Sequence, residues 1–311
     1  MYDEQLWAEK YRPRSIDDCV LPAKTKAFFK TLVEKNELPN LLLEGDAGCG
    51  KTTVAKALCN ELGYDYLFIN ASESGNIDTL RTRIRDYAST ISIDGTKKVV
   101  ILDEADYLNP QSTQPALRGF MEEFSCNARF ILTCNFKDRI LEPLQSRCSH
   151  VSFVIPKDER LAMAKLFIGR MTMILKAENV TFEMAALTQL VKKYFPDYRK
   201  ILNALNMYAV GGSIGTDIFA FIAHTPIREV VGFMKAKDYA KLSDWVETTE
   251  FDQETVFEEF RKNRHEIFAK KSLPDFDQTV WEFARSAHQV QNPKINMQGF
   301  LVTLMDTCEV V

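Results

Sequence analysis

The chain has 311 residues, a length that suggests about two or three domains, and 46% of the residues are hydrophobic, enough for each domain to bury a core. Charged residues make up 26%, and the sequence has no low-complexity stretch or fixed-period repeat, which excludes a disordered, fibrous or solenoid protein. The net charge is −4, so overall positive charge cannot carry binding of nucleic acid, which would need a local basic surface or several copies acting together.

The N-terminal 40 residues are rich in charge and are interrupted by Pro13, Pro22 and Pro39. Acidic residues stand where a secretory signal peptide carries basic ones, and no apolar stretch follows them. The longest apolar runs, such as 99–102, are far too short to span a membrane. The seven cysteines are scattered without CxxC spacing, which argues against a zinc module and a disulfide framework. We therefore expect a cytoplasmic protein with free thiols and no membrane contact.

Short apolar runs alternate with amphipathic segments through the first half of the chain. The runs at 41–44, 66–70, 99–102 and 129–134 predict strands, and the segments 51–62, 77–90 and 114–124 predict helices. Strands that alternate with helices indicate an α/β fold, a parallel sheet with helices on both faces.

The alternation stops after Val154. Residues 157–211 carry apolar side chains at helical spacing, Gly211 and Gly212 form a break, and the helical pattern resumes from about Pro226. We therefore expect three domains: an α/β domain at 1–155, a helical domain at 156–225 and an all-α domain at 226–311.

A phosphate-binding loop is predicted between the first strand and the helix that follows it. Residues 45–52 read GDAGCGKT, which is the Walker A pattern in the strand-loop-helix context that it requires. Glycines let successive backbone N–H groups point at phosphate oxygens, and the helix N-terminus adds its positive end. Lys51 can reach the β- and γ-phosphates, and the Thr52 hydroxyl can bind Mg²⁺.

Two acidic residues, Asp103 and Glu104, end the third predicted strand. This places Asp103 at the carboxyl edge of the sheet, where ligands of open α/β folds bind. We expect Asp103 to hold the metal ion through water and Glu104 to orient and deprotonate the attacking water. The letters DEAD at 103–106 also occur in RNA helicases, but this chain is too short for the two domains of those enzymes.

Several segments occur in an order that resembles the sliding-clamp loader ATPases of the replication factor C type, within the AAA+ class. Besides the phosphate-binding loop they are 7–13 (WAEKYRP), 103–106 (DEAD), 116–122 (ALRGFME) and 145–148 (QSRC). Residues 50–59 and 195–200 are closer still to the small subunit of T-even phage clamp loaders, which implies the cytoplasm of a host cell. The match is dense from about residue 5 to 205, and beyond 225 it rests on length and helical character.

The resemblance implies a role for each of several residues. Tyr11 and Arg12 would lie near the adenine, Asn135 would be the sensor that touches the γ-phosphate or its water, and Arg199 would reach back from the helical lid. Arg147 would act in trans on the ATP of a neighbouring subunit, and Gln114 and Arg118 would link neighbouring sites to DNA. The full set implied for ATP is Tyr11, Arg12, Gly45, Gly48, Cys49, Gly50, Lys51, Thr52, Thr53 and Arg199.

Plainer alternatives stand beside these roles. Asn135 could cap the turn that follows its strand, and Tyr11 could be a packing aromatic. Arg147 and Arg199 could be surface residues.

Arg81 and Arg85 are four residues apart and share one face of the helix predicted at 77–90, whereas Arg83 points elsewhere. Such a pair is ordinarily a solvated helix face. By resemblance, this helix lines a central chamber and its basic residues follow the phosphate backbone of DNA, a contact that gives position without sequence readout.

The resemblance implies a clamp-loader subunit. ATP and Mg²⁺ would be its cofactors, and its partners would be a sliding clamp, primer–template DNA, further copies of itself and one different subunit in a hetero-pentamer. ATP binding would open the clamp, and hydrolysis would release it closed on DNA. The alternatives are another AAA+ motor, such as a branch-migration helicase, and a scaffold subunit that does not hydrolyse ATP.

Overall fold

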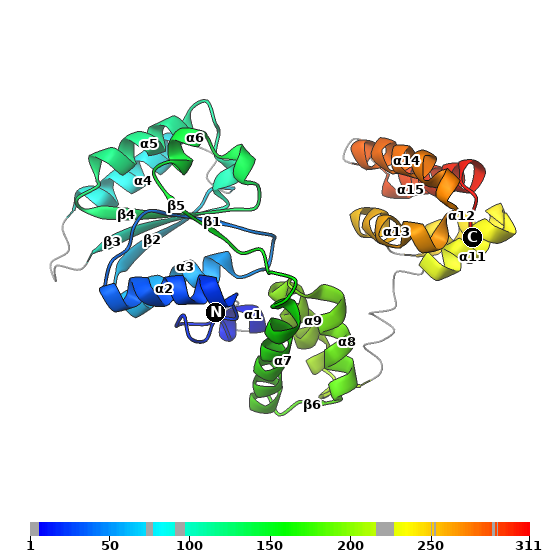
Figure 1. Cartoon of the computed structure of the whole chain (residues 1–311), viewed down its shortest axis with the longest axis horizontal. Coiled ribbons are helices and arrows are strands. Elements are labelled where there is room, and N and C mark those ends of the chain that lie inside the picture. Colours follow the sequence, from blue (N-terminus) through cyan, green and yellow to red (C-terminus); the bar gives the residue numbers. More distant parts are fainter. Residues whose placement is uncertain are drawn as a thin grey trace. The chain divides into compact units, whose positions relative to one another are not determined.

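The computed structural model describes residues 6–72, 77–90, 97–215, 227–249, 251, 253–287, 290 and 292–311. The chain divides into two compact units, Met1–Phe219 and Ala220–Val311. Figure 1 shows the course of the chain through both units.

A parallel sheet of five strands forms the centre of the first unit. Its strands lie in the order β2-β3-β4-β1-β5. Their bounds are β1 Leu41–Glu44, β2 Asp65–Asn70, β3 Lys98–Asp103, β4 Ala128–Cys134 and β5 Ser149–Ser152. Because all strands run the same way, their carboxyl ends meet at one edge of the sheet, where β1 leads into the Gly-rich loop.

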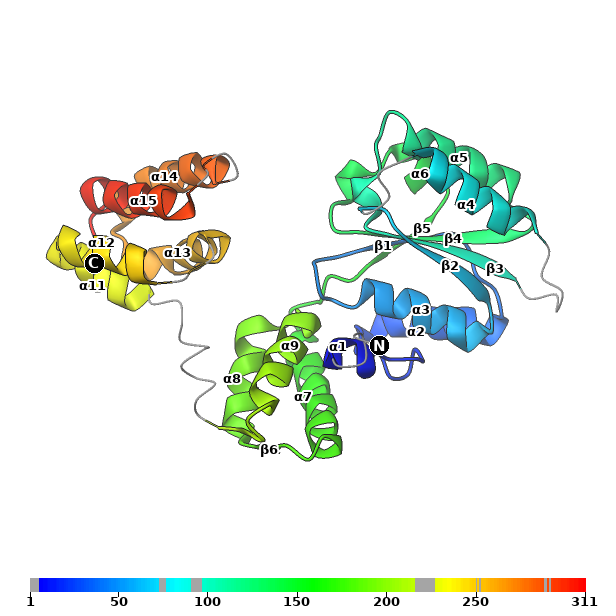
Figure 2. The ribbon, with the colours of Figure 1, turned by 180° about the vertical axis from the view of Figure 1, so that it is seen from behind.

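Helices cover both faces of this sheet, as Figures 1 and 2 show from opposite sides. One face carries α2 (Ala23–Lys35) and α3 (Lys51–Leu62), and the other carries α4 (Ile77–Ser89), α5 (Thr113–Glu123) and α6 (Glu142–Gln145).

Alternate residues of each strand serve opposite faces of the sheet. Leu42 and Val100 are buried in the core beneath α4 and α5, whereas Leu41, Leu43 and Val99 are buried in the core beneath α2 and α3. This alternation follows from the two-residue repeat of a strand, and a strand that is covered on both faces reads as a continuous apolar run.

A helical lid follows the sheet within the same unit. It consists of α7 (Arg160–Ala177), α8 (Met184–Tyr194) and α9 (Tyr198–Ala209), with a small sheet of β6 (Thr181–Phe182) and β7 (Ser213–Ile214). Asp197 caps α9, because its side chain accepts a hydrogen bond from the Lys200 N–H at 2.9 Å.

The second unit is helical in the part that the structure describes. Its helices are α11 (Ile227–Ala236), α12 (Tyr239–Thr248), α13 (Gln253–Ile267), α14 (Leu273–Ser286) and α15 (Pro293–Thr307), with a short 3-10 turn η4 (Lys270–Ser272). A cluster of phenylalanines closes its core: Phe260, Phe268, Phe276 and Phe300 are fully buried.

The predicted fold class is confirmed: a parallel sheet with flanking helices, a lid and C-terminal helices. The predicted strands and helices of the first half agree with the structure within one residue at each end. The sequence did not predict several elements of the first unit, among them α2 and the edge strand β5. The three-domain division at 155 and 225 stays a prediction. Among the described residues, no helix is both long and apolar enough to cross a membrane.

Candidate nucleotide site

The loop between β1 and α3 has the shape of a phosphate cradle. Gly48 and Gly50 have φ angles of 73° and 96°, in the left-handed region that favours glycine. Lys51 is the first residue of α3, and its buried ammonium donates to the carbonyl oxygens of Gly45 at 2.6 Å and Asp46 at 2.8 Å. The loop therefore curls around its own lysine, with the N-terminus of α3 facing the space above it.

The Thr52 hydroxyl and Asp103 lie against each other at the carboxyl edge of the sheet. Thr52 donates to Asp103 Oδ1 at 2.6 Å, and the Thr133 hydroxyl at the end of β4 donates to the same oxygen at 2.7 Å. This pair brings one hydroxyl and one carboxylate together beside the phosphate cradle. Oxygen ligands of this kind suit Mg²⁺, so the residues present fit the metal ion that the sequence predicts.

Glu104 follows Asp103 with a backbone φ of 56°, in the left-handed region. Its N–H donates to the Thr133 hydroxyl at 3.0 Å, which ties this strained residue to the neighbouring strand. A non-glycine residue in this region costs about 1–3 kcal/mol and is typical of functional sites. Glu104 lines the same cavity as Lys51 and Thr52.

Asn135, directly after β4, accepts a hydrogen bond from the Lys51 ammonium at 2.8 Å through its Oδ1. Asp106, a residue whose role the sequence did not predict, holds Asn135 in place. It is 6% exposed, and its Oδ2 accepts from the N–H groups of Asn135 and Phe136, both at 3.2 Å. Asp106 thus fixes the turn that carries Asn135, and both residues follow adjacent strands.

Tyr11 and Arg12, from the N-terminal segment of the chain, also line the cavity. Arg12 donates to the Thr53 hydroxyl of α3 at 3.1 Å and forms an ion pair with Glu9. The Tyr11 hydroxyl donates to Glu178, just after the end of the lid helix α7, and burial together with this hydrogen bond raises the pKa of Tyr11. Hydrogen bonds from Lys10 and Tyr11 lower the pKa of Glu178, so its carboxylate stays ionised.

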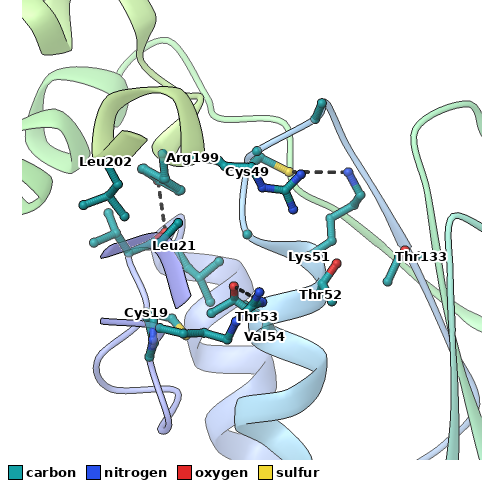
Figure 3. Close-up of a pocket in the computed structure, with 18 of the residues that line it drawn as sticks. Cys19, Leu21, Cys49, Lys51, Thr52, Thr53, Val54, Thr133, Arg199 and Leu202 are labelled. Carbon is teal, nitrogen blue, oxygen red and sulfur yellow. Dashed lines mark hydrogen bonds between the residues drawn. The ribbon is translucent and has the colours of Figure 1, made fainter. Parts of the chain in front are cut away.

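The lid is docked directly on the phosphate-binding loop. The Tyr198 N–H donates to the Gly48 carbonyl at 3.1 Å, and the Tyr198 hydroxyl donates to the Val20 carbonyl at 3.1 Å. Arg170 of α7 donates to the carbonyl oxygens of Tyr11 at 3.0 Å and Asp18 at 2.8 Å. Figure 3 shows Arg199 extending from the lid toward the loop that carries Cys49 and Lys51.

Cys49 stands inside the loop and is buried. Burial raises the pKa of its thiol, which lies 3.9 Å from the Lys51 ammonium, so the thiol is protonated at neutral pH. Apolar side chains, among them Val54, Phe167 and Leu202, also line the cavity. The cavity therefore combines polar groups around Lys51 with apolar side chains, some of them from the lid, which suits a phosphate chain joined to a flat ring.

The structure brings most of the predicted site residues into one cavity. Its lining includes Tyr11, Arg12, Gly48, Cys49, Gly50, Lys51, Thr52, Thr53, Asp103, Glu104, Asn135 and Arg199. Gly45 contributes the carbonyl oxygen that holds Lys51.

Besides Gly45, five predicted residues do not line this cavity: Arg81, Arg85, Gln114, Arg118 and Arg147. Arg81 and Arg85 are exposed on α4, and Arg118 is exposed on α5. Gln114 is fully buried at the start of α5 and bonds to the backbone of the segment before α6. Arg147 is bound by Glu122.

The sequence did not predict three supporting residues: Asp106, Arg170 and Glu178. Each acts on a partner at least 29 residues away in the chain. Only Asp106 could have been noticed in the sequence, because it is the last residue of the DEAD motif at 103–106. Within the described residues, no group of three or more His, Cys, Asp or Glu side chains forms a further metal cluster.

Two family descriptions match successive parts of the first unit. Residues 41–155 match the ATPase family associated with various cellular activities (AAA), and residues 159–220 match the AAA+ ATPase lid domain of the sliding-clamp-loader large subunit. The two matches correspond to the sheet with its helices and to the helical lid.

Similar proteins come from phages and archaea. The sliding-clamp-loader large subunit of Escherichia phage RB69 is 40% identical over 244 residues, which cover 77% of this chain and 76% of the relative. The replication factor C small subunit of Sulfurisphaera tokodaii is 35% identical over 252 residues, which cover 76% of this chain and 75% of the relative. The phage relative is named a large subunit, whereas the resemblance led us to expect the phage small subunit.

Among solved structures, a variant of Thermotoga maritima RuvB superposes with a TM-score of 0.55, covering 72% of this chain and 78% of that chain. Its sequence identity is 19%, so this likeness shows a shared fold and nothing about substrate.

Proposed function

Because this chain belongs to the sliding-clamp-loader family of AAA+ ATPases, we propose that it is a subunit that loads a sliding clamp onto primer–template DNA. It is a nucleotide-binding ATPase by family. The observation that carries the proposal is the convergence of Lys51, Asp103 and Asn135 in a cavity closed by a lid of the clamp-loader type.

In this proposal the nucleotide is ATP, with its phosphates on the loop 45–50. Lys51 would exchange its present carbonyl and amide partners for phosphate oxygens, which attract the ammonium more strongly because they are charged. The adenine would lie against the apolar part of the lining, beside Tyr11 and Leu202. Thr52 and Asp103 would hold Mg²⁺, which supplies positive charge next to the transferred phosphoryl group when it is bound.

Glu104 would accept the proton of the attacking water, and Asn135 would orient that water or the γ-phosphate. The hydrogen bond between Glu104 N–H and Thr133, and the two that Asp106 accepts, fix the backbone of both residues before nucleotide arrives. Arg199 would contact the phosphates from the lid, so that closure of the lid and occupation of the site favour each other.

The site would be completed by a second subunit. Arg147 lies outside its own cavity, which supports action on the ATP of a neighbouring chain. We propose a hetero-pentamer of several copies with one different subunit, held together by residues 226–311 as a helical collar, with residues 156–225 as the lid. Gln114 and Arg118 would couple neighbouring sites, and Arg81 and Arg85 would follow the DNA backbone. The complex would work in the cytoplasm, of the host cell for a phage protein.

Steady-state hydrolysis of ATP by the assembled complex tests the proposal. Clamp and primed DNA together should stimulate hydrolysis more than either does alone, whereas a four-way junction should not replace primed DNA. Stimulation by the junction without any clamp would instead indicate a branch-migration motor, and an absence of hydrolysis under every condition would indicate a scaffold subunit.

A further inference from the structure

The side chain of Arg147 is held in one orientation by two elements. Its Nε donates to Glu122 Oε1 at 3.0 Å, and its Nη2 contacts the same oxygen as part of an ion pair. Its Nη1 donates to the Pro143 carbonyl oxygen at 2.7 Å. One N–H of each guanidinium nitrogen is therefore engaged.

A guanidinium has five N–H donors, so two donors of Arg147 make no hydrogen bond within the described part of the chain. One belongs to each of the two terminal nitrogens. A planar guanidinium matches phosphate oxygens through such donors. The three internal contacts thus hold the guanidinium and leave one N–H on each terminal nitrogen available to a phosphate.

Glu122 is in the last turn of α5, and Gln114 is in the first turn of the same helix. The Gln114 amide donates to the Arg139 carbonyl at 2.9 Å and accepts from the Leu141 N–H at 2.8 Å. The segment from Arg139 to Arg147 is therefore attached to α5 at both ends, by Gln114 at its start and by Glu122 at its finish. The position of Arg147 follows the position of α5.

We propose that Glu122 is a positioning residue that orients Arg147 for the γ-phosphate of a neighbouring subunit. This inference rests on the proposed function, because it assigns a partner to the arginine that acts in trans. Without Glu122, an exposed arginine side chain would sample many rotamers and would present its fork to the neighbour only part of the time.

The exposure of the Arg147–Glu122 pair indicates that Glu122 orients Arg147 and does not withhold it from a phosphate. The side chains of Arg147 and Glu122 are 33% and 54% exposed, so a second chain can reach them. The attraction in such an exposed pair is weak, and it is too weak to withhold the guanidinium from a multiply charged phosphate. Arg147 lowers the pKa of Glu122, which keeps the carboxylate ionised and able to accept both bonds at neutral pH.

The first test is hydrolysis by the assembled complex with clamp and primed DNA. Glu122→Ala should lower kcat about fivefold, the upper range for an exposed ion pair, with KM for ATP unchanged. Glu122→Gln keeps an oxygen acceptor for Arg147 and should lose less. Glu142→Ala, which removes a carboxylate from the adjacent helix α6 without a contact to Arg147 in the structure, is the matched control and should behave as wild type.

The second test is a double-mutant cycle, because a residue that acts through Arg147 has no effect where Arg147 is missing. Glu122→Ala should therefore add nothing to Arg147→Ala. An equal further loss in both backgrounds, or a wild-type rate for Glu122→Ala alone, would overturn the inference and leave the proposed function intact. A wild-type rate for Arg147→Ala would overturn the trans role in the proposed function itself.

Discussion

At the scale of single residues, the proposed hydrolysis depends on Glu104, which lines the cavity and has a left-handed backbone conformation. Glu104→Gln keeps the shape of the side chain and the backbone hydrogen bond to Thr133 but removes the base. The variant should bind ATP with wild-type affinity and hydrolyse it at least about 100-fold more slowly. Nucleotide affinity by titration and single-turnover hydrolysis measure the two properties separately. Hydrolysis near the wild-type rate would assign the base to another residue.

The residues of the proposed site were easier to locate from the sequence than the residues that support them, for one physical reason. Lys51, Thr52 and Asp103 belong to local patterns in which a strand end or a Gly-rich loop fixes each side chain, so spacing alone places them. Glu178 and Arg170 reach the site across more than 150 residues of chain, and only the docking of the lid brings them to Tyr11. Arg199 was placed by its resemblance to a lid arginine.

At the scale of elements, the lid and the phosphate-binding loop are coupled through Gly48. A Cβ added to Gly48 would lie 1.9 Å from Asp197 Oδ1, the side chain that caps α9, and the Gly48 φ angle is 73°. Gly48→Ala should therefore cost about 1–2 kcal/mol for the backbone and about 1 kcal/mol more for the lost cap. It should also weaken ATP binding, since the lid must move away from the loop.

Gly63 is the matched control for this substitution. It has a φ angle of 64°, and a Cβ added there would meet nothing within 4 Å. Gly63→Ala should lower the free energy of unfolding by about 1–2 kcal/mol and leave ATP affinity unchanged. Chemical denaturation measures the free energy of unfolding of each variant, and titration measures its ATP affinity. Equal effects of the two substitutions on ATP affinity would refute coupling between loop and lid.

Helix α4 carries the proposed contact with DNA. Arg85 of α4 lies over the Phe120 ring of α5 at 5.7 Å and 4.0 Å from Glu123, so the helix rests on the element that positions Arg147. Replacing Arg81 and Arg85 together by Ala should weaken DNA binding by the complex equally for all sequences. The slope of log K against log salt should fall by about 2, close to one per phosphate contact.

Arg83→Ala is the control for this pair, because Arg83 is an exposed arginine of the same helix that points away from the face of Arg81 and Arg85. It removes the same charge and should leave the slope nearly unchanged. Equal slopes of log K against log salt for the double variant and for Arg83→Ala would indicate that Arg81 and Arg85 are solvated surface residues without a DNA contact.

Two of the elements that the sequence did not predict, β5 and α2, have weak sequence signals for different reasons. β5 reads SHVS and buries only Val151, because it is a short edge strand whose position depends on pairing with β1. α2 carries four lysines among its 13 residues and fully buries only Phe29. The apolar periodicity that would predict a helix is therefore weak in its sequence. The central strands were predictable because burial on both faces makes them continuously apolar.

At the scale of the whole molecule, each active site of the proposed assembly is formed by residues of two chains. Arg147→Ala subunits lack the trans arginine and keep the phosphate-binding loop, and Lys51→Ala subunits have the reverse defect. Complexes formed from a mixture should contain some interfaces with an intact Lys51 facing an intact Arg147, and should regain part of the hydrolysis that each variant lacks alone. Wild-type subunits mixed in the same way control for exchange. A mixture without activity, beside an active wild-type mixture, would place Arg147 outside the catalytic site.

The most direct measurement of the central claim is clamp loading itself. The assembled complex, a labelled sliding clamp and a primed circular DNA are incubated with ATP, and clamp bound to DNA is separated from free clamp by gel filtration. We predict that the clamp elutes with the circle only when the complex and ATP are present, and that it is lost when the circle is linearised, since a closed ring slides off an open end. Clamp retention that is independent of ATP, or that survives linearisation, would contradict the account.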